Sequence, residues 1–144
     1  YSLVASILDW AAQKGSKEIV ILDGVAGIEH DDKAYCAAEE DLVRTMADKD
    51  ISMIPQGFIT GIPGGLLNEC LVREIQGLTL LAKANKIAPD SIAAATVIEA
   101  VNRFYDMNID TSGLKADKDR ISSEFSELSQ KYVEHREATS GMYM

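Results

Sequence analysis

The sequence predicts an α/β protein built around a mainly parallel sheet. Short apolar runs of β-forming residues alternate along the chain with longer segments whose apolar residues recur at helical spacing. In the stretch Pro55–Glu69, a strand-like run passes through a glycine and proline turn directly into a helix. Strands and helices that alternate in this way are typical of parallel sheets joined by right-handed crossovers.

The glycine turn, PQGFITGIPGGLLNE, is the most informative of these segments. Gly61, Gly64 and Gly65 lack a Cβ, so the turn can adopt positive φ or bring another backbone close. Pro63 has its φ preset near the helical value, which suits a first helical turn. A helix N-terminus can bind phosphate, but no G-K-[ST] follows and the spacing does not fit G-x-G-x-x-G. Close packing of strand and helix is therefore the favoured interpretation.

The chain begins with a helix at Ser2–Lys14, whose apolar residues share one face and which Gly15 ends. Glu18–Leu22 is a short, continuous apolar run of the kind that is buried on both faces of a parallel sheet. The dipeptide Asp23-Gly24 ends this strand, and a loop follows at residues 25–33.

The middle of the chain continues the alternation. Apolar residues at helical spacing predict a helix at Ala34–Lys49, which Asp50 ends before the strand Ile51–Thr60. The helix that starts at Gly64 is expected to end near Arg73 or Glu74. A third apolar strand is expected at Leu78–Ala82. The helix after it is expected to begin with Asp90 or Ser91 as its N-cap and to end at Asn108.

The predicted core and the last helix complete the fold. Residues 1–110 are expected to form the α/β domain, residues 111–137 an amphipathic helix, and residues 138–144 a flexible tail. The almost fully buried residues are expected to be Ile19, Ile21, Ile59, Leu80, Val97 and Val101. The last helix carries a narrow apolar stripe that needs a cover, formed by Leu114, Ile121, Phe125, Leu128 and Tyr132.

The composition limits the class of protein. A length of 144 residues and a hydrophobic fraction of 47% suit one domain with a sizeable core. The net charge of −9 disfavours nucleic acid and anionic membranes as partners, and no apolar run reaches the roughly 18 residues of a membrane helix. Cys36 and Cys70 lack metal-like spacing, which indicates reduced thiols and a cytoplasmic location. Because the chain begins on a helix at Tyr1, we expect a front portion with further strands to be missing.

No catalytic or metal-binding constellation is apparent in the sequence. Glu29, His30, Asp31 and Asp32 stand together in one loop, where a solvated charged surface is the more common role. A metal site or an acid–base cluster is the alternative, which only geometry can decide. Cys70 has no neighbouring histidine to activate it, so it is interpreted as a core thiol.

The end of the chain carries a pattern of its own. Met142, Tyr143 and Met144 give a hydrophobic residue, a tyrosine and a final residue with its carboxylate. Such an ending lets a mobile tail insert an aromatic ring and a carboxylate into a pocket that contains a cation. The long helix and short tail before it favour this interpretation.

With these segments in view, the chain resembles the proteasome assembly chaperone family, in its archaeal branch. The matching segments are ILDGVAG, QGFITGIPGGLLNECLVREIQG and LTLLAKANKIAPDSIAAATVIEAVNRFYDMNID. The resemblance covers most of residues 1–137. It implies a phosphorylase-like, three-layer α/β/α sandwich that forms homo-oligomers. Some family members are grouped with the ATP-grasp superfamily without an identified reaction. Members with a hydrophobic-Tyr-X ending dock on the proteasome core particle, which implies this role for Met142, Tyr143 and Met144.

The sequence and the resemblance lead to two functional hypotheses. The first is a binding protein without cofactor or catalysis: an assembly chaperone or activator that engages the α-subunits of the proteasome core particle. The alternative is a phosphorylase-like or ATP-grasp-like enzyme with a small-molecule site at the carboxyl ends of the strands. Its ligand loop would comprise Gly24, Gly61, Gly64 and Gly65. The lack of a Lys or Arg beside the glycine turn counts against the enzyme.

Overall fold

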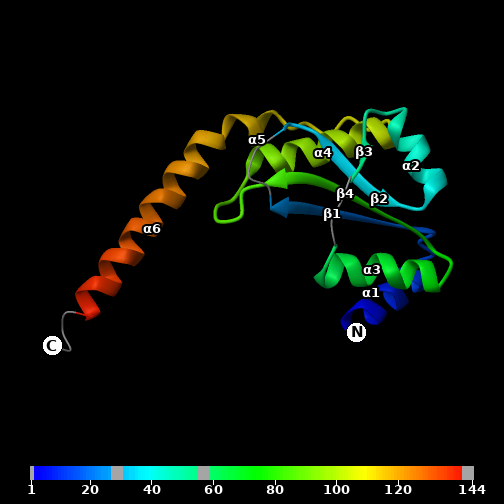
Figure 1. The fold of residues 1–144 in the computed structure, drawn as a ribbon, viewed down its shortest axis with the longest axis horizontal. Helices are drawn as coiled ribbons and strands as arrows, with labels where there is room; N and C mark the ends of the chain where they lie inside the picture. Colours follow the sequence, from blue (N-terminus) through cyan, green and yellow to red (C-terminus); the bar gives the residue numbers. More distant parts are fainter. Residues whose placement is uncertain (1, 27–30, 55–58, 141–144) are drawn as a thin grey trace.

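The computed structural model describes residues 2–26, 31–54 and 59–140, and only the backbone of residues 2, 122 and 134–140. Helices flank a central sheet, and the last helix projects from this body (Figure 1). The elements of the described chain are, in order, α1 (Ser2–Gln13), β1 (Glu18–Ala26), β2 (Ala34–Ala38), α2 (Glu40–Ala47), β3 (Ser52–Met53), α3 (Gly61–Val72), β4 (Gln76–Ala84), α4 (Ser91–Tyr105), α5 (Ser112–Ala116) and α6 (Lys118–Ser140).

The sheet has four strands in the order β1-β4-β2-β3. The pairing of the edge strand β1 with β4 is parallel and runs from Glu18 opposite Gln76 to Ala26 opposite Ala84. On its other side β4 pairs with β2 in the antiparallel sense, and β2 in turn pairs with β3 in parallel. The α/β class is confirmed, and the sheet is mixed because one of its pairings is antiparallel.

The antiparallel strand β2 corrects one sequence prediction. The helix predicted at Ala34–Lys49 is wrong over its first part, where β2 lies, and helical only over α2. Ala34 and Cys36, two residues apart on the strand, are both buried in the core, and each residue of β2 pairs with one of β4. This pairing outweighs the helix propensity of alanine. The predicted strand Ile51–Thr60 is reduced to Ser52–Met53, while residues 55–58 lie outside the described residues.

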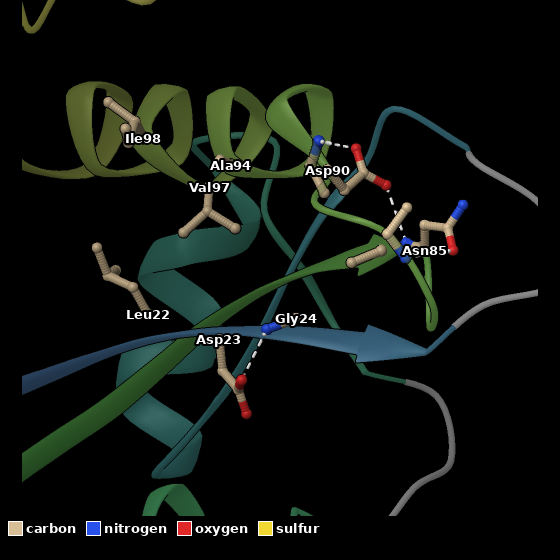
Figure 2. Close-up of a pocket in the computed structure, with 11 residues that line it drawn as sticks. Leu22, Asp23, Gly24, Asn85, Asp90, Ala94, Val97 and Ile98 are labelled. Carbon is tan, nitrogen blue, oxygen red and sulfur yellow. Dashed lines mark hydrogen bonds between the residues drawn. The ribbon is translucent and has the colours of Figure 1, made fainter. Parts of the chain in front are cut away.

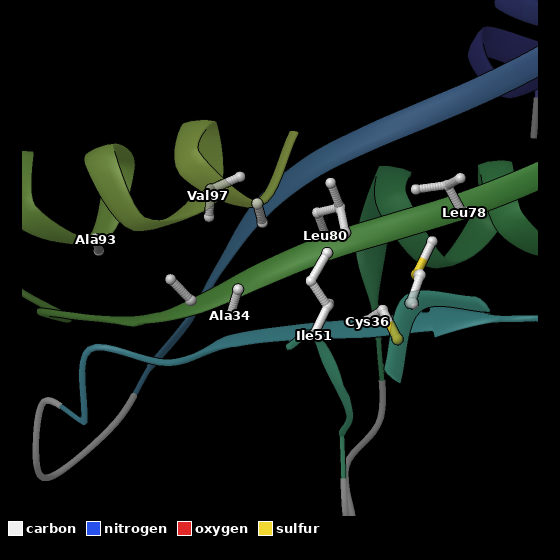
Figure 3. Close-up of a cluster of buried hydrophobic side chains, with 10 residues drawn as sticks. Ala34, Cys36, Ile51, Leu78, Leu80, Ala93 and Val97 are labelled. Carbon is white, nitrogen blue, oxygen red and sulfur yellow. The ribbon is translucent and has the colours of Figure 1, made fainter. Parts of the chain in front are cut away.

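Two hydrophobic clusters pack on opposite faces of the sheet. Helices α2 and α4 cover one face, where side chains of α2, α4 and β2 pack with Leu78 and Leu80 of β4 (Figure 3). Helices α1 and α3 cover the other face, where Val4, Leu8 and Cys70 pack with Ile21 of β1. Since β4 lies between both clusters, it is buried throughout its centre.

The predicted core is confirmed in part. Ile21, Leu80 and Val97 are buried as expected. The other members of the prediction are half-buried, and they are Ile19, Ile59 and Val101. Ile19 lies on β1, which pairs only with β4 in the described chain, so one edge of this strand has no neighbouring strand to help bury it.

The helices of the second half begin close to where the sequence predicts. Asp90 is the N-cap of α4, and its carboxylate accepts a hydrogen bond from the Ala93 N–H at 3.0 Å. The helix ends at Tyr105 rather than at Asn108, because Asp106 takes a left-handed conformation with φ of 51°. The last helix, predicted as one element, is divided near Asp117 into α5 and α6.

Substitution of Leu80 tests whether β4 is the centre of the core. Leu80→Ala should lower the free energy of unfolding by about 2–5 kcal/mol, because the side chain is 0% exposed and its loss leaves a cavity. The control is Leu22→Ala on β1, where the side chain is 52% exposed and the loss should stay below about 1 kcal/mol. Denaturant unfolding of both variants measures this, and equal losses would contradict the assignment.

Candidate protein-interaction site

Helix α6 projects away from the sheet and the other helices (Figure 1). It has 23 residues, which corresponds to a length of about 34 Å at 1.5 Å per residue. The apolar stripe predicted from the sequence is divided along it. The proximal members, Leu114 of α5 and Ile121 and Phe125 of α6, are half-buried, whereas the distal members Leu128 and Tyr132 are 66% and 67% exposed. The distal half of α6 is therefore a helix with uncovered apolar side chains.

The start of this projection is fixed to α4 by polar contacts. Glu99 of α4 accepts a hydrogen bond from the Thr111 hydroxyl at 2.9 Å and forms an ion pair with Lys115 at 2.5 Å. The ammonium of Lys115 lowers the pKa of Glu99, so this carboxylate stays charged at neutral pH. At the first turn of α6, Arg120 pairs with Asp117 at 3.0 Å. These contacts set the direction in which α6 leaves the domain.

The residues predicted to bind the proteasome, Met142, Tyr143 and Met144, lie outside the described residues. The described helix reaches Ser140, into the segment where the sequence predicts a flexible tail. The binding role of Met142, Tyr143 and Met144 remains a prediction.

A cavity of about 410 Å³ lies between α4 and the carboxyl ends of β1 and β4. Its walls are mainly apolar, with Leu22, Val97 and Ile98 among them (Figure 2). Asp90 and Asn85 stand at one end, where Asp90 accepts hydrogen bonds from the Asn85 and Ala93 N–H groups. None of the lining residues is a Lys, Arg or His. The cavity therefore suits an apolar group better than a phosphate, which needs cationic or N–H donors.

The glycines proposed as a ligand loop are placed in two different regions. Gly24 lines the cavity, and its N–H donates to the Asp23 carboxylate at 2.8 Å, which points to the side of β1 away from α4 (Figure 2). Gly61, Gly64 and Gly65 belong to α3 and do not line this cavity. A Cβ on Gly64 would lie 2.1 Å from the Ile59 carbonyl oxygen, so this glycine is needed for close packing. Gly61 supplies a positive φ of 69°.

The acidic loop contains one ion pair that the sequence did not predict. Asp31 lies 2.6 Å from the Lys83 ammonium of β4 and also accepts a hydrogen bond from the Tyr35 hydroxyl. Partial burial by itself raises the pKa of Asp31, but the hydrogen bonds from Lys83, Tyr35 and the Lys33 N–H outweigh it and lower the pKa to about 2. This contact fixes the start of β2 to β4. Asp32 is exposed, and the other members of the predicted cluster, Glu29 and His30, lie outside the described residues.

The described side chains include two buried thiols and no metal-ligand cluster. Among the side chains that the structure describes, no group of three or more His, Cys, Asp and Glu is arranged to hold a metal ion. Cys36 and Cys70 are free thiols, buried in the two clusters on opposite faces of the sheet. Burial raises the pKa of both thiols, which disfavours the reactive thiolate.

The family model for the PAC2 family matches residues 1–129. The chain belongs to the PAC2 family. The resemblance to proteasome assembly chaperones, carried by the glycine turn and by the segment that follows it, is thereby confirmed. The match includes the domain and the proximal part of α6.

Relatives of this PAC2 family protein are longer than the chain. It is 23% identical over 131 residues to an uncharacterized protein of Methanocaldococcus jannaschii, a match that spans 91% of this chain and 55% of that protein. Two solved structures from Pyrococcus furiosus are similar. PbaA, described as an archaeal homolog of proteasome-assembly chaperone, has a TM-score of 0.77 and 20% identity over 99% of this chain and 61% of PbaA. PbaB, described as an archaeal proteasome activator, has a TM-score of 0.73 and 23% identity over 88% and 57%.

The chain thus spans somewhat more than half the length of these relatives. At these identities the structural likeness shows a shared fold. Among the described helices of the PAC2 chain, none combines the length and the apolar character needed to cross a membrane.

The ion pair of Asp31 predicts a change of stability in acid. Because the pKa of Asp31 is lowered from 3.8 to about 2 on folding, its contribution is present above pH 4 and is lost as the pH falls toward 2. Asp31→Asn should therefore lower the unfolding free energy at pH 7 by about 1 kcal/mol, the upper end for a partly exposed pair.

The difference between parent and Asp31→Asn should shrink between pH 4 and pH 2, as followed by urea unfolding at each pH. The neighbouring Asp32→Asn makes the same change of charge on an exposed side chain and serves as the control. A difference that stays constant down to pH 2 would show that the Asp31 carboxylate is not the group responsible.

Proposed function

We propose that this protein is a proteasome assembly chaperone or activator that binds the α-ring of the proteasome core particle through Met142, Tyr143 and Met144. The observation that carries the proposal is the direction of α6, which leads the chain away from the domain and reaches Ser140, just before this ending. Membership of the PAC2 family supports the choice of partner, as do structural relatives described as a chaperone homolog and a proteasome activator.

The chemistry of the ending fits a pocket between two subunits. Tyr143 offers a ring to bury and a hydroxyl that can donate a hydrogen bond. The Met144 carboxylate can pair with a lysine of the pocket in a charge-assisted hydrogen bond. A single short tail loses conformational freedom on binding, so we expect its affinity to be low. Several tails presented together would gain by effective concentration.

We therefore include self-association in the proposed function. The exposed side chains of Leu128 and Tyr132, on a helix with no neighbouring element along its distal half in the described chain, favour a second copy as their cover. A homo-oligomer would present several C-termini to the α-ring, where neighbouring subunits offer repeated pockets. The proposed location is the cytoplasm.

The enzyme alternative has less support. A phosphorylase-like or ATP-grasp-like reaction needs cationic groups around a phosphate, and the lining of the cavity beside Gly24 includes none. The α/β/α sandwich of phosphorylase-like type is retained as the proposed fold of the whole protein, since α1 with α3 and α2 with α4 cover opposite faces of the sheet. A shared fold supports no activity by itself.

The tail is tested by binding to purified proteasome core particle. Deletion of residues 142–144, and separately Tyr143→Ala, should each weaken binding by about tenfold or more, since a buried aromatic anchor commonly contributes above 1.4 kcal/mol. Addition of one glycine after Met144 should weaken it similarly, because this moves the carboxylate while Tyr143 is kept. Surface plasmon resonance measures all three.

The control for the tail is Thr139→Ala, which changes a residue of α6 close to the ending but leaves the last three residues intact. It should bind like the parent. If the deletion, Tyr143→Ala and the extended chain all bind as well as the parent, the tail is not the docking element.

Self-association is tested by light scattering over a range of concentrations. The parent should form an oligomer, and Leu128→Ser combined with Tyr132→Ser should shift it toward monomer by removing the apolar side chains of distal α6. The control is Gln130→Ser, whose spacing from Leu128 puts it on the opposite side of the helix. Parent protein that remains monomeric at millimolar concentration would remove this part of the proposal.

A further inference from the structure

We infer that Glu99 and Asn102 of α4 are positioning residues for docking on the core particle. They hold residues 106–111, the link between α4 and α5, so that α6 presents the C-terminal tail in one direction. The inference rests on the proposed function of the tail. It adds that the affinity for the core particle depends on side chains that lie beside the start of α6, far from the tail itself.

The amide of Asn102 holds the link at Ile109. Its Oδ1 accepts a hydrogen bond from the Ile109 N–H, and its Nδ2 donates one to the Ile109 carbonyl, both at 2.9 Å. An asparagine amide carries a donor and an acceptor side by side, so it can satisfy both backbone groups of one residue. The link, which begins at the left-handed Asp106, is therefore held against α4.

The carboxylate of Glu99 holds the other end of the link. Its Oε1 accepts a hydrogen bond from the Thr111 hydroxyl at 2.9 Å and lies 2.5 Å from the Lys115 ammonium, so it joins both the end of the link and α5 to α4. Thr111 is 8% exposed, which leaves little water to replace this bond if it is lost. Glu99 and Asn102 are three residues apart on one face of α4, and together they form the latch.

The direction of α6 depends strongly on how its start is held. Since α6 is about 34 Å long, a change of about 10° in its direction moves its far end by about 6 Å. In the part of α6 whose side chains the structure describes, the ion pairs are local, from Arg120 to Asp117 and to Glu124, and none reaches α4 or the sheet. The direction therefore rests on the latch together with the half-buried side chains of Ile121 and Phe125.

A fixed direction favours docking of several tails at once. The tails of an oligomer reach the repeated pockets of an α-ring together only if their helices point toward those pockets. The effective concentration of the second tail falls when the helices spread over many directions, and a helix that is already held loses less freedom on binding. Loss of the latch should thus weaken binding of the whole protein although the tail is unchanged.

Exchange of charges in the latch tests this inference in the full chain. Glu99→Lys places two ammonium groups beside each other and should weaken binding to purified core particle about tenfold in surface plasmon resonance. Glu99→Lys combined with Lys115→Glu restores an ion pair of reversed sense and should recover most of the affinity. Asn102→Ala removes both bonds to Ile109 without a change of charge and should weaken binding about threefold or more.

The matched control is Glu40→Lys on α2. Glu40 forms an exposed ion pair with Arg44 at 2.5 Å, so this variant makes the same change of charge and also breaks an ion pair. Helix α2 lies far from α5 and α6 (Figure 1), and the variant should bind like the parent. The comparison separates the latch from an effect of net charge on association. Urea unfolding shows that each variant is folded before binding is compared.

The direction of α6 is also measured without the core particle. Spin labels on Ala94→Cys of α4 and Ser129→Cys of α6 report the distance between the two helices by pulsed electron paramagnetic resonance, in protein diluted with unlabelled chains. Both positions are exposed, whereas the native Cys36 and Cys70 are buried and should not be labelled. The parent should give a narrow distance distribution, Glu99→Lys a broad one, and the charge exchange a narrow one again.

Three results would overturn the inference. They are equally wide distance distributions for the parent and Glu99→Lys, parent-like binding by both Glu99→Lys and Asn102→Ala, and a loss of affinity that Lys115→Glu does not recover. If deletion of residues 142–144 leaves binding intact, the proposed docking tail is wrong, whereas the distance measurement still decides whether the latch holds α6.

Discussion

The structure depends on the burial of one strand, β4, on both faces and along both edges. Every residue from Gly77 to Ala82 is buried, with β1 on one side, β2 on the other and a hydrophobic cluster on each face. The approach of α3 is close enough that a Cβ on Gly77 would lie 2.7 Å from the Cys70 Cβ. One cluster includes Leu78 and Leu80 of β4, and Cys70 of the other packs against Gly77 of the same strand, so helices on both faces are positioned by it.

The same strand sets the geometry of the surfaces that are proposed to face partners. At its carboxyl end, Lys83 holds Asp31 at the start of β2, and the chain turns through Asn85 into the Asp90 cap of α4. Helix α4 then carries Glu99, which fixes α5 and the beginning of α6. A series of contacts that begins in the core thus determines the direction in which α6 leads toward the proposed binding residues.

Much of the fold could be predicted from the sequence, for physical reasons that differ between elements. β1 and β4 are continuous apolar runs, and the α4 segment has both helical spacing and an aspartate cap, so each carries its own local signal. β2 carries no such signal, because the sequence AYCAA favours helix locally and becomes a strand only by pairing with β4. The sequence does not predict the break near Asp117, because the spacing of apolar residues continues across it from Leu114 to Ile121.

The candidate site likewise has features that the sequence predicts and features that it does not. The ending Met142-Tyr143-Met144 can be recognised in the sequence, since its chemistry lies in consecutive residues. The ion pair of Asp31 with Lys83 was not, because it depends on the antiparallel register that sets Tyr35 opposite Leu81. The exposed state of Leu128 likewise depends on where α6 leaves the domain.

The central claim, that the C-terminal tail is the part that enters the proteasome core particle, is tested most directly by site-specific photo-cross-linking. A photoreactive phenylalanine analogue in place of Tyr143 should capture the α-subunits on irradiation of the complex. The same analogue at Trp10, a large exposed side chain of α1, should capture them weakly or not at all. Strong capture from position 10 and none from position 143 would contradict the account, because the domain rather than the tail would then face the core particle.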